Sequence, residues 1–175
     1  MDKASNVVNL QYRVNQAFMG RYFIGHTPLI SMCPNSHAWA ALVNPPGSDV
    51  NVYLNTFTVS NYNECPLEAM LWLADAPRFG KESCDVAVSN QAIVPHPKPE
   101  GKIVFASDKK CPVSDGTSIF PRIVGPYSTE VGNYYGKIVV PPDHAVVITL
   151  DLLGRPEGEA GVAWGWWEEQ RRHCR

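Results

Sequence analysis

The stretch that decides the fold class is VNVYLNTFTVSNY, residues 50–62. Its apolar residues recur with a period of two, which is the period of a β-strand. One set of alternate positions holds Val50, Val52, Leu54, Thr56 and Thr58, and the other holds Asn51, Tyr53, Asn55, Phe57 and Val59. The first set is apolar early and polar late, so the apolar face changes sides near Asn55. We expect a β-bulge, or a shift of the strand between two sheets, near Asn55.

Runs of similar character lie on both sides of this stretch. The 15 prolines and 13 glycines of the chain fall between short runs of β-branched and aromatic residues. These runs are RYFIG (21–25), HAWAALV (37–43), CDVAVSN (84–90), KIVFAS (102–107), TSIFPRIV (117–124), YGKIVV (135–140), HAVVITL (144–150) and AGVAWGWWEE (160–169). Roughly ten strands at this spacing are typical of sandwiches and barrels. The sequence therefore predicts an all-β protein, an antiparallel β-sandwich of jelly-roll type.

One apolar run, LEAMLWLA at residues 67–74, fits both a helix and a strand. Pro66 before it and Pro77 after it leave room for little more than two helical turns, which is short for a stable helix. This spacing favours a strand.

Two proline-containing stretches predict changes of direction. IVPHPKPEG, residues 93–101, has prolines at alternate positions and should form an extended crossing from one sheet to the other. Pro141 and Pro142 separate two strongly β-forming runs and predict a corner or hairpin.

Residues 1–20 differ in character from the rest of the chain. Their apolar residues Val8, Leu10, Tyr12, Val14 and Phe18 stand among asparagines and glutamines. We expect an N-terminal arm over residues 1–20, followed by a single β-sandwich domain over residues 21–175. The arm could form an edge strand or fold as an arm on its own domain, or it could add a strand to a neighbouring subunit.

Composition and charge limit the classes of partner that the sequence supports. Hydrophobic residues make up 45% of the chain, charged residues 18%, and the formal net charge is −2. This balance gives no electrostatic reason to expect nucleic acid or an anionic membrane. No apolar run approaches the roughly 20 residues of a membrane helix, and the first residues lack the apolar core of a signal peptide. The low charged fraction suggests that neighbouring subunits cover part of the surface.

The five cysteines are Cys33, Cys65, Cys84, Cys111 and Cys174, at wide spacings and without a CxxC pair. They could all be packed or free thiols, because cysteine often behaves as a small buried hydrophobe. Alternatively, they could crosslink subunits, and Cys174 in the terminal RRHCR is the best candidate for this role.

No motif supports catalysis. The chain contains neither a GxSxG nucleophile setting nor a phosphate-binding glycine loop. The best of the weak candidates for a metal site is the group His26, Cys33 and His37, but it has no evident fourth ligand. We therefore expect a protein that is not an enzyme, with no catalytic residue, no cofactor and no metal.

The segment AGVAWGWWEEQ, residues 160–170, carries the strongest candidate interface. In an extended strand, Trp164 and Trp166 share one face, where we expect core packing, whereas small residues alternate on the other face. The small residues around Gly165 invite close approach by a facing sheet or a partner. Trp167 is the best candidate for an interface aromatic or, with Tyr127, Tyr134 and Tyr135, for a platform that binds a glycan.

Three patterns, GRYFIGHT (20–27), AWAALVNPPGSDVNVYLNTFTVSN (38–61) and AWGWWEE (163–169), resemble an uncharacterised family of small all-β proteins from spore-forming Firmicutes. The resemblance runs over nearly the whole chain and brings no catalytic residue. A weaker likeness is to jelly-roll subunits of spore-appendage fibres, and it implies a location on the spore surface or outside the cell after lysis of the mother cell. Those subunits carry cysteines in the N-terminal arm, whereas this chain has none before Cys33.

Together these patterns predict a self-assembling jelly-roll subunit of a surface or spore-associated fibre or layer. The alternative is a carbohydrate-binding or other ligand-binding sandwich module. The expected interface residues are Val8, Leu10, Tyr12, Val14, Phe18, Gly165, Trp167 and Cys174.

Overall fold

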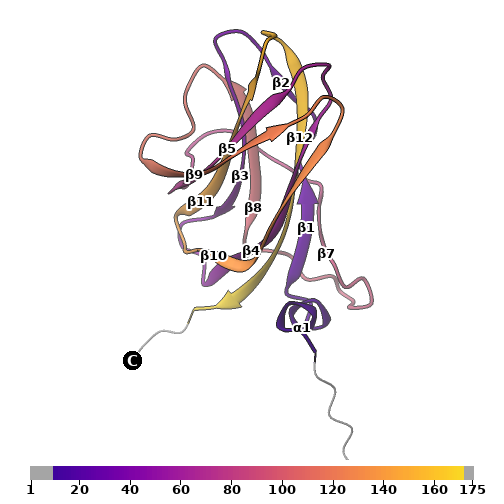
Figure 1. The fold of residues 1–175 in the computed structure, drawn as a ribbon. Coiled ribbons are helices and arrows are strands. Elements are labelled where there is room, and N and C mark those ends of the chain that lie inside the picture. The colour runs from indigo at the N-terminus through magenta and orange to yellow at the C-terminus, as the bar shows by residue number, and fades with distance from the viewer. Residues whose placement is uncertain (1–9, 172–175) are drawn as a thin grey trace, which may run out of the picture.

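The structure, a computed structural model, describes residues 10–171 and consists of two β-sheets and one short helix (Figure 1). Two of the expected interface residues, Val8 and Cys174, lie outside the described residues. The helix is α1 (Tyr12–Phe18). The strands are β1 (Tyr22–His26), β2 (Ile30–Met32), β3 (His37–Asn44), β4 (Val50–Asn61), β5 (Leu67–Asp75), β6 (Lys81–Glu82), β7 (Val86–Val88), β8 (Lys102–Asp108), β9 (Gly116–Val124), β10 (Thr129–Val140), β11 (His144–Leu152) and β12 (Gly158–Gln170).

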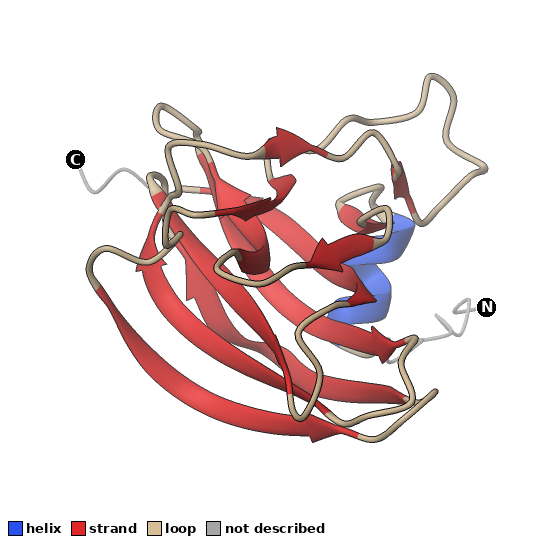
Figure 2. Ribbon diagram, turned by 90° about the horizontal axis from the view of Figure 1, so that it is seen from above, coloured by secondary structure: helices blue, strands red, loops and turns tan. Residues whose placement is uncertain are grey.

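The strands form two antiparallel sheets that face one another (Figures 1 and 2). Sheet A has the order β10-β4-β12-β1-β7, and β2 also pairs with β12. Sheet B has the order β6-β8-β3-β11-β5-β9. The predicted antiparallel β-sandwich is confirmed.

Eight of the strands pair in a nested order. The first pairs with the last, β1 with β12, and inside this pair β3 pairs with β11, β4 with β10 and β5 with β9. This nesting is the topology of a jelly roll, in which a long antiparallel ribbon wraps around the core. It places the first and last strands side by side in sheet A, where β12 lies between β4 and β1.

Four local predictions are confirmed. LEAMLWLA lies in strand β5. Asn55 is the extra residue of a bulge, because Gly165 of β12 pairs with Thr56 and Trp166 pairs with Leu54, so Asn55 has no partner in β12. Residues 93–101 lie in the connection from β7 in sheet A to β8 in sheet B, and Pro141 and Pro142 occupy the corner from β10 in sheet A to β11 in sheet B.

The main core lies between the sheets and includes Trp164 and Trp166, as the alternation in β12 predicted. A second apolar cluster covers the outer face of sheet B, where Trp39 packs edge-on against Phe79 with ring centroids 5.4 Å apart. The two sheets therefore differ: the chain covers the outer face of sheet B itself.

The N-terminal arm is the main correction to the sequence analysis. Residues 12–18 fold on their own domain, which was one of the expected alternatives, but they form a helix and not an edge strand. The helix has no side-chain N-cap and is too short to be stable alone, so tertiary contacts must hold it. The Tyr12 ring meets the Trp167 ring edge-on, and the Tyr12 hydroxyl donates a 2.7 Å hydrogen bond to Glu169 Oε1. Between residues 10 and 171 no helix combines the length and the apolar character that crossing a membrane would require.

Candidate functional site

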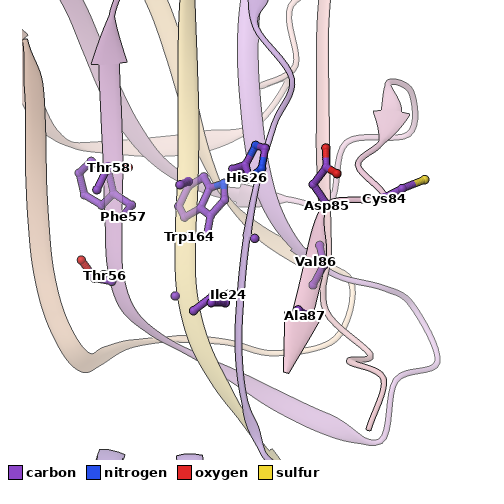
Figure 3. A pocket seen from close by; sticks show the side chains of 13 residues that line it. Ile24, His26, Thr56, Phe57, Thr58, Cys84, Asp85, Val86, Ala87 and Trp164 are labelled. Carbon is purple, nitrogen blue, oxygen red and sulfur yellow. The ribbon is translucent and has the colours of Figure 1, made fainter. Parts of the chain in front are cut away.

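The outer face of sheet A is the candidate functional site. The register aligns Ile24 of β1 with Gly165 of β12 and with Thr56 of β4 in one row across the sheet. A neighbouring row aligns His26, Ala163 and Thr58. Both rows have their smallest residue in the central strand, so the face is hollow along β12 (Figure 3).

This hollow has a volume of about 600 Å³. A second hollow of about 360 Å³ continues it and shares His26, Thr58 and Ala163. We call the two together the sheet A groove. The side chains that line it from the outer face include Ile24, His26, Thr56, Thr58, Ala87, Ala163, Leu29, Tyr62 and Asp85. Its size lies within the range of roughly 300–1,000 Å³ that is usual for binding sites.

Tyr22 marks one end of the groove. A Cβ atom at Gly165 would lie 2.6 Å from the Tyr22 hydroxyl, so the glycine is what allows the tyrosine to lie across β12. Asn55, the bulge residue, donates a 2.7 Å hydrogen bond from Nδ2 to this hydroxyl. Burial raises the pKa of Tyr22 above the usual value of a tyrosine. The bulge predicted at Asn55 therefore helps to shape the candidate site.

Trp167 lies beyond Tyr22 on the same face, and its ring is covered. The ring stacks on Tyr53 with centroids 5.3 Å apart and an interplanar angle of 1°, while Tyr12 of α1 meets it edge-on. Its Nε1 donates a 2.8 Å hydrogen bond to Glu169 Oε1, and the residue is 4% exposed. The prediction that Trp167 offers an open ring face to a glycan is therefore wrong, because the protein's own tyrosines occupy it.

The other aromatic residues of that prediction do not assemble into one platform. Tyr134 stacks on Phe57 and contacts Phe120. Tyr135 lies under the guanidinium of Arg13, which is 4.7 Å from the ring centroid. Tyr127 is exposed between β9 and β10.

Helix α1 has an inverted distribution of polarity. Gln16 is its buried residue, at 3% exposure, whereas Phe18 is 61% exposed. The exposed large hydrophobic residues of this segment form what we call the α1 apolar patch: Leu10, Tyr12, Val14, Phe18 and Met19. Four of these five are residues that the sequence analysis selected for an interface.

The reactive side chains are dispersed. Cys33, Cys84 and Cys111 are exposed and Cys65 is partly buried, and all four are free thiols. Within residues 10–171, no three His, Cys, Asp or Glu side chains come together as metal ligands would. His26 lies where the two hollows of the groove meet, and Figure 3 shows Asp85 beside it, with Cys84 beyond Asp85.

Glu168 points into the sandwich, opposite to its neighbour Glu169, as the alternation of a strand requires. Its carboxylate accepts hydrogen bonds from Trp166 Nε1 at 3.0 Å and from the backbone N–H groups of Gly101 at 2.8 Å and Glu100 at 3.0 Å. It thereby ties the crossing between the sheets to β12. Burial, which outweighs these hydrogen bonds, raises the pKa of Glu168 above the usual value of a glutamate.

The raised pKa of Glu168 makes stability depend on pH. The folded protein holds this proton more tightly than the unfolded chain, so its contribution to the free energy of unfolding is largest in acid and falls as the pH rises from the unfolded to the folded pKa. We expect Glu168→Gln to remove this contribution to the slope of the free energy of unfolding against pH. Urea unfolding between about pH 4 and pH 8 checks it. The exposed control Glu157→Gln should keep the wild-type slope, and an unchanged slope in Glu168→Gln would contradict the prediction.

Sequence reasoning found part of this site. It identified the small-residue track around Gly165 and the apolar residues of α1, but it did not identify Ile24, His26 or Asp85 as neighbours of that track. The alternation in RYFIG, with Phe23 in the core, places Ile24 on the outer face. Its position opposite Gly165 depends on the pairing of strands that are far apart in the sequence.

Comparisons with known proteins add a family and no activity. A model described as "Family of unknown function (DUF6143)" matches residues 1–173. Searches of curated proteins and of solved structures found no match to the chain.

Proposed function

Because this chain belongs to DUF6143, a family of unknown function, we propose its function from its own surface: it is a non-catalytic β-sandwich subunit that associates with copies of itself.

The observation that carries this proposal is the inverted helix α1. An amphipathic helix on the surface of a monomeric protein buries its apolar side and exposes its polar side. Here Gln16 is buried while Tyr12 and Phe18 are 60% and 61% exposed. Several large apolar side chains exposed on one short segment are typical of an interaction surface. Self-association would remove the patch from water.

The edges of the sandwich support the same proposal. Strand β10 is an edge of sheet A and β9 an edge of sheet B, with 12 and 9 residues respectively. Their exposed apolar residues include Phe120, Ile123, Val131 and Val139. Long edge strands with apolar side chains can template pairing with another chain.

Two separate surfaces, the edges and the α1 apolar patch, would let copies extend into a fibre or a layer, which is the form of assembly that we propose. A spore-associated setting rests on the family resemblance of the sequence alone. The glycan-binding alternative is not favoured, because the covered ring of Trp167 removes its central residue.

Analytical ultracentrifugation of the full-length protein tests the proposal. We expect the average mass to increase with concentration in the wild type and to remain that of a monomer in Phe18→Asp, because a charge within the patch would have to be buried on association. Tyr127→Asp is the matched control, since Tyr127 is 69% exposed and lies outside the patch. A wild type that stays monomeric from micromolar to millimolar concentration would contradict self-association.

A further inference from the structure

We propose that the α1 apolar patch of one copy docks into the sheet A groove of a second copy, with Phe18 and Met19 entering the hollow. This inference rests on the proposed self-association and names both of the surfaces that meet.

The floor of the groove suits a large apolar side chain. Aromatic rings cover two glycines of β10 in the same sheet: the ring of Phe57 lies on Gly132, and that of Trp167 lies on Gly136. Along the track Gly161, Ala163 and Gly165, Tyr22 lies against Gly165 and the Tyr62 ring lies 3.6 Å from the position of a Cβ on Gly161. The open part of the floor is therefore Ala163, which both hollows share. An incoming ring would complete a pattern that the sheet already uses.

The exposed part of the arm supplies the matching side chains. Phe18 and Met19 are 61% and 56% exposed and follow one another at the end of α1. The groove wall offers Ile24, itself 48% exposed, beside the backbone of Gly165. Contact between the two would bury apolar surface on both partners, which favours association.

Charge also favours a second copy as the occupant. The segment from Leu10 to Arg21 carries Arg13 and Arg21 and no acidic residue. The acidic residue that lines the groove is Asp85, which forms no ion pair with any of the described residues. The segment and the groove are therefore complementary in charge as well as in polarity.

The positions of the two surfaces allow a closed pair. Helix α1 rests on Trp167, which lies on the outer face of sheet A two residues along β12 from Gly165. A projection and a hollow side by side on one face form a self-complementary surface, so a two-fold rotation places each patch over the other groove. The edges β9 and β10 remain available for further growth of the assembly.

A disulfide-trapping experiment tests this arrangement. Cys84 is exposed and lines the groove, so Phe18→Cys should form an intersubunit disulfide with Cys84 on addition of an oxidant. We expect a covalent dimer whose linked peptides contain positions 18 and 84, and its loss when Cys84→Ser is added. Tyr127→Cys, with a similar exposure outside the patch, should not yield a link to Cys84.

A second variant tests the groove without an added thiol. Ala163→Arg would place a long charged side chain on the floor of the hollow, and we expect the dimer dissociation constant to rise by at least about tenfold. Circular dichroism would verify that this variant is folded. If the wild type associates but neither the 18–84 link nor the effect of Ala163→Arg is seen, the docking inference fails while the proposed function stands. If the wild type does not associate at all, the proposed function fails together with the docking inference, and the α1 apolar patch would then have to bind a different protein.

Discussion

Asn61→Ala is expected to lower the free energy of unfolding by about 3–5 kcal/mol, because it removes the donors and acceptor of a buried hub of hydrogen bonds. Asn61 is 2% exposed. Its Nδ2 lies 2.9 Å from the carbonyl oxygen of Cys65, 3.1 Å from that of Val124 and 2.9 Å from that of Gly125. Alanine would leave buried carbonyl groups without a donor.

The same side chain also accepts hydrogen bonds through Oδ1. The backbone N–H of Asn63 donates to it at 3.0 Å and Asn63 Nδ2 at 2.7 Å. Asn61 thereby joins the end of β4 in sheet A to the end of β9 in sheet B. The connection is between sheets, so its loss should weaken the whole sandwich and not one loop.

Two further variants sharpen this prediction, with urea unfolding as the measurement. Asn61→Asp keeps the shape but replaces the donor with an oxygen that faces three carbonyl oxygens, so we expect at least as large a loss at neutral pH. Asn15→Ala, at an exposed position, should change stability by less than about 0.5 kcal/mol. A loss below about 1 kcal/mol in Asn61→Ala would show that the hub is not required.

Gly136→Ala is expected to destabilise the protein by about 2–5 kcal/mol, the combined effect of backbone strain and overpacking. Gly136 has φ +78°, in the left-handed region that side chains disfavour. A Cβ atom there would also overlap the ring of Trp167. Because Trp167 is held between Tyr53 and Tyr12, its ring cannot move without disturbing the support of α1.

Gly47→Ala separates the two effects. Gly47 has φ +82°, close to that of Gly136, but a Cβ atom there would meet nothing within 4 Å. We therefore expect a loss of about 1–2 kcal/mol in Gly47→Ala, which represents strain alone. Thermal and urea unfolding of both variants would measure the difference, which we assign to the contact with Trp167. Equal losses would mean that the ring moves freely.

The sequence by itself determined the fold class. The period of two is a property of the local backbone, so the alternation in residues 50–62 was sufficient to predict a strand. The change of its apolar face predicted an irregularity near Asn55, either a bulge or a shift between sheets, and the structure has the bulge. The alternation in β12 likewise placed Trp164 and Trp166 in the core and the glycine and alanine track on the other face.

Only the tertiary structure decided how these elements form a surface. The row of Ile24, Gly165 and Thr56 depends on strand pairings that join residues more than 100 positions apart, and a local period carries no information about such partners. The conformation of α1 and the burial of Trp167 likewise depend on contacts between residues that are far apart in the sequence. Residues 12–18 are helical because Trp167 and Glu169 offer contacts to Tyr12, and Trp167 is buried because Tyr12 and Tyr53 cover it.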